Sequence, residues 1–265
     1  MSKKLLIILL MLASGLAKAQ QNEGNFFTSF DGTKIYYEVK GEGQPVILVH
    51  GFTNNAQSWK RGTLYPALLK EGYKVIILDQ RGNGQSDKPH TDAAYANDAE
   101  AKDIMGLASA LKLKQYSIVG YSRGSIITSR VMVLDKRVRK AVMGGMGADY
   151  TNPNWPRRVH AYEALAGDTT HHDVDEMMAW IHKNNFDNQS LMLQQKYQPS
   201  TSAAELAKLK IPVLLIDGSE DNTNGDVHDL QKLIPGSKYT EVPGNHNTAG
   251  NTEQFAQAIT DFLRQ

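Results

Sequence analysis

Short, mostly apolar runs recur along the chain, separated by segments in which apolar residues follow a helical spacing. Strands are expected over residues 46–49, 75–78, 116–119, 138–143, 213–216 and 238–242. Helices are expected over residues 64–69, 94–111, 125–134, 227–234 and 253–263. Buried strands that alternate with helices predict an α/β fold, in which helices cover both faces of a mostly parallel sheet.

A β-hairpin is expected before the first buried strand. Residues 26–30 and 34–40 flank Asp31-Gly32, a pair that is typical of a tight turn between antiparallel strands. The chain is therefore expected to enter the sheet through this hairpin.

The alternation of strands and helices stops between Met146 and Leu209. This stretch contains Asn-Pro-Asn-Trp-Pro at residues 152–156 and one expected helix over residues 173–183, but no expected strand. A helical insertion at about residues 147–208 is the simplest interpretation, and it would act as a lid over the sheet. The alternative is an ordinary helical connection without a role in binding.

Residues 1–19 have the pattern of a secretory signal peptide. Lys3 and Lys4 precede an apolar run over residues 5–12, and Ala17-Lys18-Ala19 forms a small-x-small cleavage site. We expect this segment to be removed and the domain at residues 20–265 to be periplasmic or extracellular, with no stable membrane anchor. An uncleaved N-terminal anchor is the alternative.

The composition of the 265 residues excludes several classes of function. The chain has 29 lysine and arginine residues against 28 aspartate and glutamate residues, and a net charge of +1 gives no general footprint for nucleic acid. Without residues 1–19 it loses three lysines and no acid, so the net charge becomes −2. The absence of cysteine excludes disulfides, a thiolate nucleophile and cysteine-ligated zinc.

The strongest chemical signal is Gly120-Tyr121-Ser122-Arg123-Gly124. It matches G-x-S-x-G between an expected strand and an expected helix, which is the context in which this motif marks a nucleophilic serine. The glycines lack Cβ atoms where the turn is crowded, and the helix N-terminus offers N–H groups to a developing oxyanion. We therefore predict that Ser122 is a nucleophile.

A serine nucleophile needs a base, and His246 is the best placed of the eight histidines. It lies in Pro243-Gly244-Asn245-His246, directly after the last expected strand. A parallel sheet would bring that loop to the same edge as Ser122. His246 is therefore the predicted base.

The base in turn needs an orienting carboxylate. Asp217, Glu220 and Asp221 all follow the expected strand at residues 213–216. Asp221 is favoured because the chain has cleared the strand end there and can reach His246, and Asp217 is the main rival. Glu220 is expected to face solvent.

His50-Gly51-Phe52 directly follows the expected strand at residues 46–49. Gly51 permits a close approach of the backbone, so the N–H of Phe52 would be one oxyanion donor and the N–H of Arg123 the other. His50 is expected to be structural, because it lies at the strand end and a second base is not needed.

Taken together, these residues resemble the α/β-hydrolase superfamily over most of the chain after residue 19. The resemblance rests on five stretches: residues 50–52, residues 79–87, the Ser122 motif, residues 218–221 and His246. Residues 79–87 are similar to the family's D-x-R-G-x-G-x-S loop, which implies that Asp79 and Arg81 fix a glycine-rich turn. The order Ser, acid, His is the one expected of this fold.

The resemblance points to one branch of the superfamily. This branch holds small esterases, cofactor-free haloperoxidase-like proteins, C–C bond hydrolases and proline iminopeptidases. Serine at position 122 argues against epoxide hydrolases and haloalkane dehalogenases, which place aspartate there. Many relatives carry His and Met around the serine, where this chain has Tyr121 and Arg123. Arg123 is expected either to bring positive charge near the site or to form a surface salt bridge.

The resemblance implies two-step acyl transfer with no metal and no organic cofactor. The expected substrate is small to medium in size, because the lid is short. A carboxylic ester is the favoured bond type, and a lactone, a thioester, an amide and a vinylogous diketone are the alternatives. The expected apolar substrate pocket is lined by Tyr121, Met146, Trp155 and Trp180, with Trp59, Met177 and Met178 as further candidates. The alternative is that most of these side chains are packed inside the lid.

Other functions remain open on the same fold. A low-turnover ligand-binding protein would have no need of Ser122, Asp221 and His246 together. An aminopeptidase would need acidic groups to capture an ammonium, and the candidates are Asp168, Asp173, Asp175 and Glu176. A C–C bond hydrolase is a further alternative, and the sequence does not determine the oligomeric state.

Overall fold

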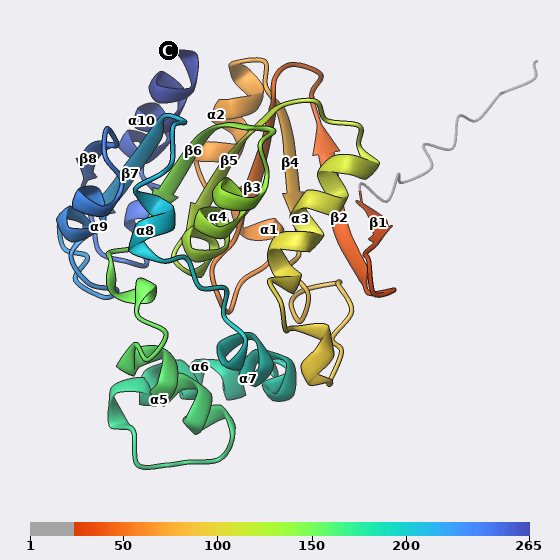
Figure 1. Cartoon of the computed structure of the whole chain (residues 1–265), viewed down its shortest axis with the longest axis vertical. Coiled ribbons are helices and arrows are strands. Elements are labelled where there is room, and N and C mark those ends of the chain that lie inside the picture. The colour runs from red at the N-terminus through yellow and green to blue at the C-terminus, as the bar shows by residue number, and fades with distance from the viewer. Residues whose placement is uncertain (1–23) are drawn as a thin grey trace, which may run out of the picture.

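A computed structural model describes residues 24–265, so the predicted signal peptide lies outside the described residues. Within this range one eight-stranded sheet forms the centre of the molecule, with helices on both of its faces (Figure 1). No helix in the described range has the length and apolar character needed to cross a bilayer.

The sheet has the spatial order β1-β2-β4-β3-β5-β6-β7-β8. Its strands are β1 (Gly24–Thr28), β2 (Lys34–Lys40), β3 (Pro45–Val49), β4 (Lys74–Leu78), β5 (Tyr116–Tyr121), β6 (Val138–Gly144), β7 (Val213–Gly218) and β8 (Lys238–Val242). The β1–β2 hairpin and the β2–β4 pair are antiparallel, and every other pair is parallel. The predicted α/β fold with a mostly parallel sheet is confirmed.

Two apolar cores lie on the two faces of the sheet. One face packs against α3 (Ala99–Ala110), α4 (Arg123–Leu134), α8 (Ala203–Leu206) and α9 (Val227–Leu233). The other packs against α1 (Gln57–Arg61), α2 (Leu64–Lys70) and α10 (Glu253–Arg264). In α10 the apolar residues Phe255, Ile259 and Phe262 follow a helical spacing, and the Thr252 hydroxyl caps the first turn by accepting from the N–H of Phe255.

The stretch between β6 and β7 contains more helix than the sequence pattern predicts. It holds α5 (Pro156–Leu165), α6 (Asp175–Lys183) and α7 (Asn188–Lys196), of which only α6 is expected. These three helices, called the cap helices below, lie at one edge of the sheet, apart from the helices on its faces (Figure 1). The described part of this stretch contains no strand, as expected.

The helix before β5 is shorter than predicted. The pattern predicts a helix over residues 94–111, whereas α3 begins at Ala99 and is preceded by a 3₁₀ turn, η1 (Asp92–Ala94). Asn97 and Asp98 have φ values of 57° and 61°. This left-handed backbone conformation cannot continue a right-handed helix, so the apolar spacing extends further than the helix itself.

Candidate active site

Ser122 lies in the turn between β5 and α4, where its backbone has φ 54° and ψ −127°. A Cβ atom at Gly120 would lie 2.2 Å from the carbonyl oxygen of Gly124, and one at Gly124 would lie 2.1 Å from that of Val49. Only glycine fits these two positions. The N–H of Ser122 donates to the carbonyl oxygen of Gly144 at 2.8 Å. The surrounding chain therefore fixes an uncommon backbone conformation at the serine.

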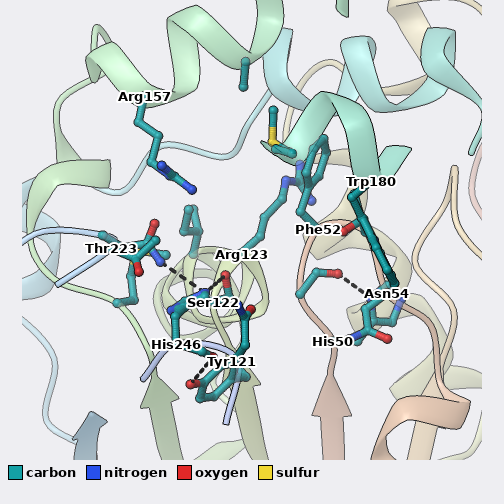
Figure 2. Close-up of a pocket in the computed structure, with 18 of the residues that line it drawn as sticks. His50, Phe52, Asn54, Tyr121, Ser122, Arg123, Arg157, Trp180, Thr223 and His246 are labelled. Atoms are coloured by element: carbon teal, nitrogen blue, oxygen red, sulfur yellow. Dashed lines mark hydrogen bonds between the residues drawn. The ribbon is translucent and has the colours of Figure 1, made fainter. Parts of the chain in front are cut away.

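The structure brings Ser122, His246 and Asp221 together. His246 Nε2 lies 2.9 Å from Ser122 Oγ, and His246 Nδ1 lies 2.7 Å from Asp221 Oδ2. Because a carboxylate only accepts, Nδ1 carries the proton and Nε2 is free to accept from the serine hydroxyl. Tyr121 packs its ring 5.5 Å from the imidazole, and its hydroxyl donates to the backbone oxygen of His246 at 2.8 Å (Figure 2).

Two aspartates lie near the end of β7, Asp217 within the strand and Asp221 in the loop after it, and the structure gives them different environments. Burial disfavours the ionised form of Asp221, yet its hydrogen bond to His246 holds the pKa of that carboxyl below its usual value. Asp217 is 7% exposed. Burial, followed by the charge of Asp221, raises the pKa of Asp217 to about 7. The carboxylate in contact with His246 is thus Asp221, while Asp217 lies behind it and Glu220 is exposed.

The loop after β3 lies against the serine. A Cβ atom at Gly51 would be 3.4 Å from Ser122 Cβ. Asn83 holds this loop by donating from Nδ2 to the carbonyl oxygens of Phe52 at 2.7 Å and Asn54 at 3.2 Å. The backbone of Phe52 is therefore fixed beside the Ser122 turn.

His50 is a structural residue by its contacts. It is 1% exposed, and its Nε2 accepts from the backbone N–H of Gln80 at 3.1 Å. The other ring nitrogen lies 2.7 Å from the carbonyl oxygen of Gly51 and is therefore the protonated one. Burial lowers the pKa of His50, so the ring stays neutral and holds the loop in place.

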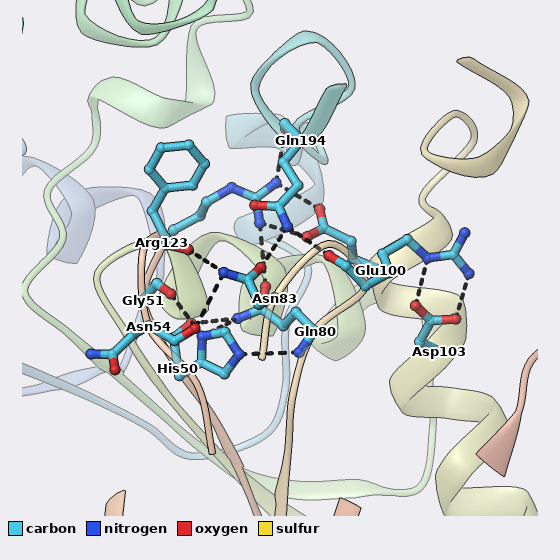
Figure 3. A network of polar contacts seen from close by, with 11 residues as sticks. His50, Gly51, Asn54, Gln80, Asn83, Glu100, Asp103, Arg123 and Gln194 are labelled. Atoms are coloured by element: carbon cyan, nitrogen blue, oxygen red, sulfur yellow. Dashed lines mark hydrogen bonds and ion pairs between the residues drawn. The ribbon is translucent and has the colours of Figure 1, made fainter. Parts of the chain in front are cut away.

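Arg123 takes neither of the two roles expected of it. Its side chain is not on the surface but 3% exposed, and it forms two 2.6 Å contacts with the carboxylate of Glu100 on α3 (Figure 3). A third bond runs from Arg123 to the backbone oxygen of Gln194 on α7 at 2.8 Å. The charge of Arg123 is therefore neutralised inside the protein, and its side chain ties a cap helix to the sheet edge.

The resemblance implies that Asp79 and Arg81 together fix one glycine-rich turn, but the structure gives the two residues separate partners. Asp79 accepts from the backbone N–H of Gln85 at 2.6 Å and so closes the glycine-rich turn. Arg81 instead pairs with Asp31 at 2.7 Å and with Asp103 at 2.6 Å. It therefore fastens the β1–β2 hairpin and α3 to the end of β4.

A cavity of about 1240 Å³ lies between the sheet edge and the cap helices and reaches Ser122 and His246. The predicted pocket residues Tyr121, Met146, Trp155 and Trp180 all line it. Trp59 and Met177 line it as well, whereas Met178 does not. The pocket is expected to be apolar, but charged side chains also line it. They are Arg61, Arg123, Arg157, Arg158, Asp173 and Glu176.

Three polar residues near the site are not anticipated from the sequence. Asn224 donates to the backbone oxygen of Gly145 at 3.0 Å and lies 3.5 Å from His246 Nε2. Gln194 donates to the backbone oxygen of Arg81 at 2.6 Å. Arg157 extends from α5 into the cavity (Figure 2). Asn224 follows the Asp221 loop closely enough to be suspected, but Gln194 and Arg157 lie on unpredicted helices.

Histidine and carboxylate groups that can hold a metal ion occur on the cap. The first group is His160, His171 and Asp173, and the second is Glu163, Asp168 and His171. The rings of His160 and His171 stack at 4.1 Å with an interplanar angle of 9°. In both groups a histidine is already paired with a carboxylate: His160 Nδ1 lies 3.0 Å from Asp173 Oδ2, and His171 Nε2 lies 2.7 Å from Glu163 Oε2.

The comparisons with known proteins agree with the observed fold. The family model described as alpha/beta hydrolase fold matches residues 44–162. A non-heme chloroperoxidase of Streptomyces lividans is 37% identical over 120 residues, which cover 44% of this chain and 42% of the relative. The chain thus matches about two fifths of the length of such curated relatives.

Solved structures extend the similarity to nearly the whole chain. A hydrolase from Pseudomonas aeruginosa PA01 superimposes with a TM-score of 0.78 at 20% identity, over 92% of this chain and all of the other. The esterase EaEST from Exiguobacterium antarcticum gives a TM-score of 0.75 at 23% identity, over 91% and 100% of the two chains. At these identities the similarity shows a shared fold.

Proposed function

We propose that this chain, a member of the α/β-hydrolase superfamily, is a serine hydrolase that cleaves small to medium carboxylic esters. The observation that carries the proposal is the chain of hydrogen bonds from Ser122 through His246 to Asp221, of which Ser122 and His246 line a cavity. This arrangement serves to activate a hydroxyl as a nucleophile, which a binding protein does not need.

In the first step His246 accepts the Ser122 proton while Ser122 Oγ attacks the ester carbonyl. The N–H groups of Phe52 and Arg123 receive the developing oxyanion, and both belong to backbone that is fixed in advance. The protonated imidazole, stabilised by Asp221, then gives its proton to the leaving alcohol.

In the second step water clears the acyl-enzyme. His246 accepts a proton from the water as it attacks the acyl carbonyl, and the proton then passes to Ser122 as the acid leaves. Asn224 lies close to His246 Nε2 and holds the carbonyl of Gly145. Asn224 thereby helps to hold the imidazole ring with its Nε2 toward the serine.

Two further parts of the proposal concern the location of the enzyme and the segment that covers its cavity. Removal of residues 1–19 would release residues 20–265 into the periplasm or outside the cell. The stretch at about residues 147–208 would act as the lid, because its helices supply one wall of the cavity.

Hydrolysis of ethyl acetate, ethyl butyrate and ethyl octanoate by the protein without residues 1–19 tests the proposal. We expect turnover that falls by at least about 10³-fold in Ser122→Ala, and that persists in the control Ser200→Ala, whose serine is exposed. An aminoacyl arylamide in the same assay tests the aminopeptidase alternative. Equal rates in wild type and Ser122→Ala, or preferred cleavage of the arylamide, would contradict the ester proposal.

A further inference from the structure

The charges that line the cavity are unevenly neutralised. Of its four arginines, Arg123 is paired with Glu100 inside the protein. Among residues 24–265, no carboxylate forms an ion pair with the other three, which are Arg61, Arg157 and Arg158. A guanidinium group that lines the same cavity as a nucleophile and has no carboxylate partner can bind an anionic group of the substrate.

Arg158 is held by neutral groups alone. Its guanidinium donates to the backbone oxygens of Gln195 and Pro153, both at 2.7 Å. Burial lowers the pKa of Arg158, which is the behaviour of a cation that has been moved out of water without a counter-charge. Arg158 directly follows Arg157 in α5, and its guanidinium adds a positive charge to this wall that no carboxylate of the described residues neutralises.

Of these three arginines, Arg157 is the one whose side chain extends toward the proposed nucleophile, Ser122 (Figure 2). Figure 2 shows its side chain extending from α5 across the cavity toward Thr223 and Ser122. Within the described residues it has no hydrogen bond and no ion pair, and it is partly buried in the cavity wall. Its planar group of N–H donors suits a carboxylate, which it can bind through two parallel hydrogen bonds.

The negative charges that line the same cavity lie on α6 and on the 3₁₀ turn that precedes it, η3 (His172–Val174). Asp173 and Glu176 come from the start of α6 and the turn before it, and Asp173 is already paired with His160 at 3.0 Å. The α5 wall therefore carries an uncompensated positive charge, which favours an anionic group over the ammonium that an aminopeptidase would capture.

We propose that Arg157 forms an anion subsite and that the preferred substrates are esters with a carboxylate a few bonds from the scissile carbonyl, such as half-esters of dicarboxylic acids. This proposal rests on the ester-hydrolase function proposed above. It narrows that function from esters in general to anionic esters. Arg157 binds the distal carboxylate while Ser122 attacks the ester end.

Three ethyl esters that differ only at the sixth carbon test the charge preference. Monoethyl adipate carries a carboxylate there, ethyl hexanoate a methyl group and ethyl 6-aminohexanoate an ammonium group. We expect kcat/KM to be at least about tenfold higher for monoethyl adipate than for ethyl hexanoate, mainly through KM, and lowest for the ammonium ester. Equal values for the first two esters, or a preference for the ammonium ester, would overturn the proposal.

Substitutions assign the preference to one residue. Arg157→Gln should lower the adipate-to-hexanoate ratio of kcat/KM by at least about tenfold, and Arg157→Lys should restore part of it. Lys183→Gln removes a positive charge at the end of α6, outside the cavity lining, and should leave the ratio unchanged. An unchanged ratio in Arg157→Gln would overturn the assignment.

A binding measurement separates this proposal from the ester-hydrolase function. Calorimetric titration of Ser122→Ala with monoethyl adipate needs no turnover, and the affinity should fall at least about tenfold when Arg157→Gln is added. Binding that depends on Arg157 without hydrolysis of any ester would contradict the hydrolase and support the subsite. Hydrolysis of ethyl hexanoate that depends on Ser122, without Arg157-dependent binding, would support the hydrolase and contradict the subsite.

Discussion

The two walls of the cavity are held in place by different kinds of contact. On the sheet wall, Ser122, Asp221 and His246 sit in loops after β5, β7 and β8, and Asp221 has a side chain only 2% exposed. On the cap wall, exposed or half-exposed histidine–carboxylate pairs connect the helices, as between His160 and Asp173 at 3.0 Å. The carboxylate that pairs with histidine is thus buried on the sheet wall and solvent-exposed on the cap wall.

This difference separates the reaction from the choice of substrate. Buried and hydrogen-bonded groups hold their geometry within narrow limits, which acyl transfer requires. Solvated pairs contribute little to stability, so side chains on the cap wall can change at small cost. We infer that the sheet wall provides the chemistry and that the cap wall, through residues such as Arg157, provides the specificity.

One histidine from the sheet wall and one from the cap helices give the largest contrast. His246→Ala should lower kcat for ethyl butyrate by at least about 10³-fold, because the serine loses its base. His160→Ala, which removes a histidine that does not line the cavity, should change kcat by less than about threefold. Steady-state kinetics of the two variants check this, and a similar loss in both would remove the distinction between the walls.

One charge-removing substitution in each kind of ion pair gives the next largest effect. Glu100→Gln leaves Arg123 buried without its counter-charge, and the free energy of unfolding should fall by about 3 kcal/mol. Asp173→Asn breaks the exposed pair with His160 and should change it by less than about 0.5 kcal/mol. Urea unfolding of both variants measures the two values, and comparable losses would show that the cap pairs are not solvent-screened.

The smallest effect concerns the aspartate pair behind His246. The pKa of Asp217, raised by burial to about 7, means that the folded protein keeps a proton which the unfolded chain releases near pH 4. Stability therefore falls as pH rises between these values, because the folded state binds more protons than the unfolded state. Asp217→Asn removes this dependence. Its free energy of unfolding, compared with that of wild type, should therefore rise by roughly 1–2 kcal/mol from pH 5 to pH 8.

Chemical unfolding of wild type and Asp217→Asn at the two pH values measures this gain. Asp221, which faces Asp217, has its pKa held low by His246, so it stays ionised across the range and is common to both proteins. A constant difference in stability between the two proteins from pH 5 to pH 8 would show that Asp217 titrates normally.

The sheet wall is largely readable from the sequence because its signals are local. Buried strands are continuous apolar runs, and the loops after them carry the glycines, Ser122, Asp221 and His246 at recognisable positions. The partners of Arg123 are not readable in this way. Glu100 is 23 residues away and Gln194 is 71 residues away, and only the folded chain brings them together.

The cap is harder to predict because its helices bury polar side chains. In α7 the amide side chains of Gln194 and Gln195 are buried beside Leu191 and Leu193, so the apolar spacing that marks a helix is broken. In α5 only Ala161 and Leu165 are buried. These helices are stabilised by contacts with the rest of the molecule that no local pattern encodes.

Covalent labelling with a fluorophosphonate tests the central claim most directly, because the reagent reports an activated serine without any choice of substrate. Mass spectrometry of the intact protein and of its peptides should find one adduct per chain, on Ser122. The adduct should be absent in Ser122→Ala and should form far more slowly in His246→Ala. A protein that forms no adduct, or one labelled equally in wild type and Ser122→Ala, would contradict the account.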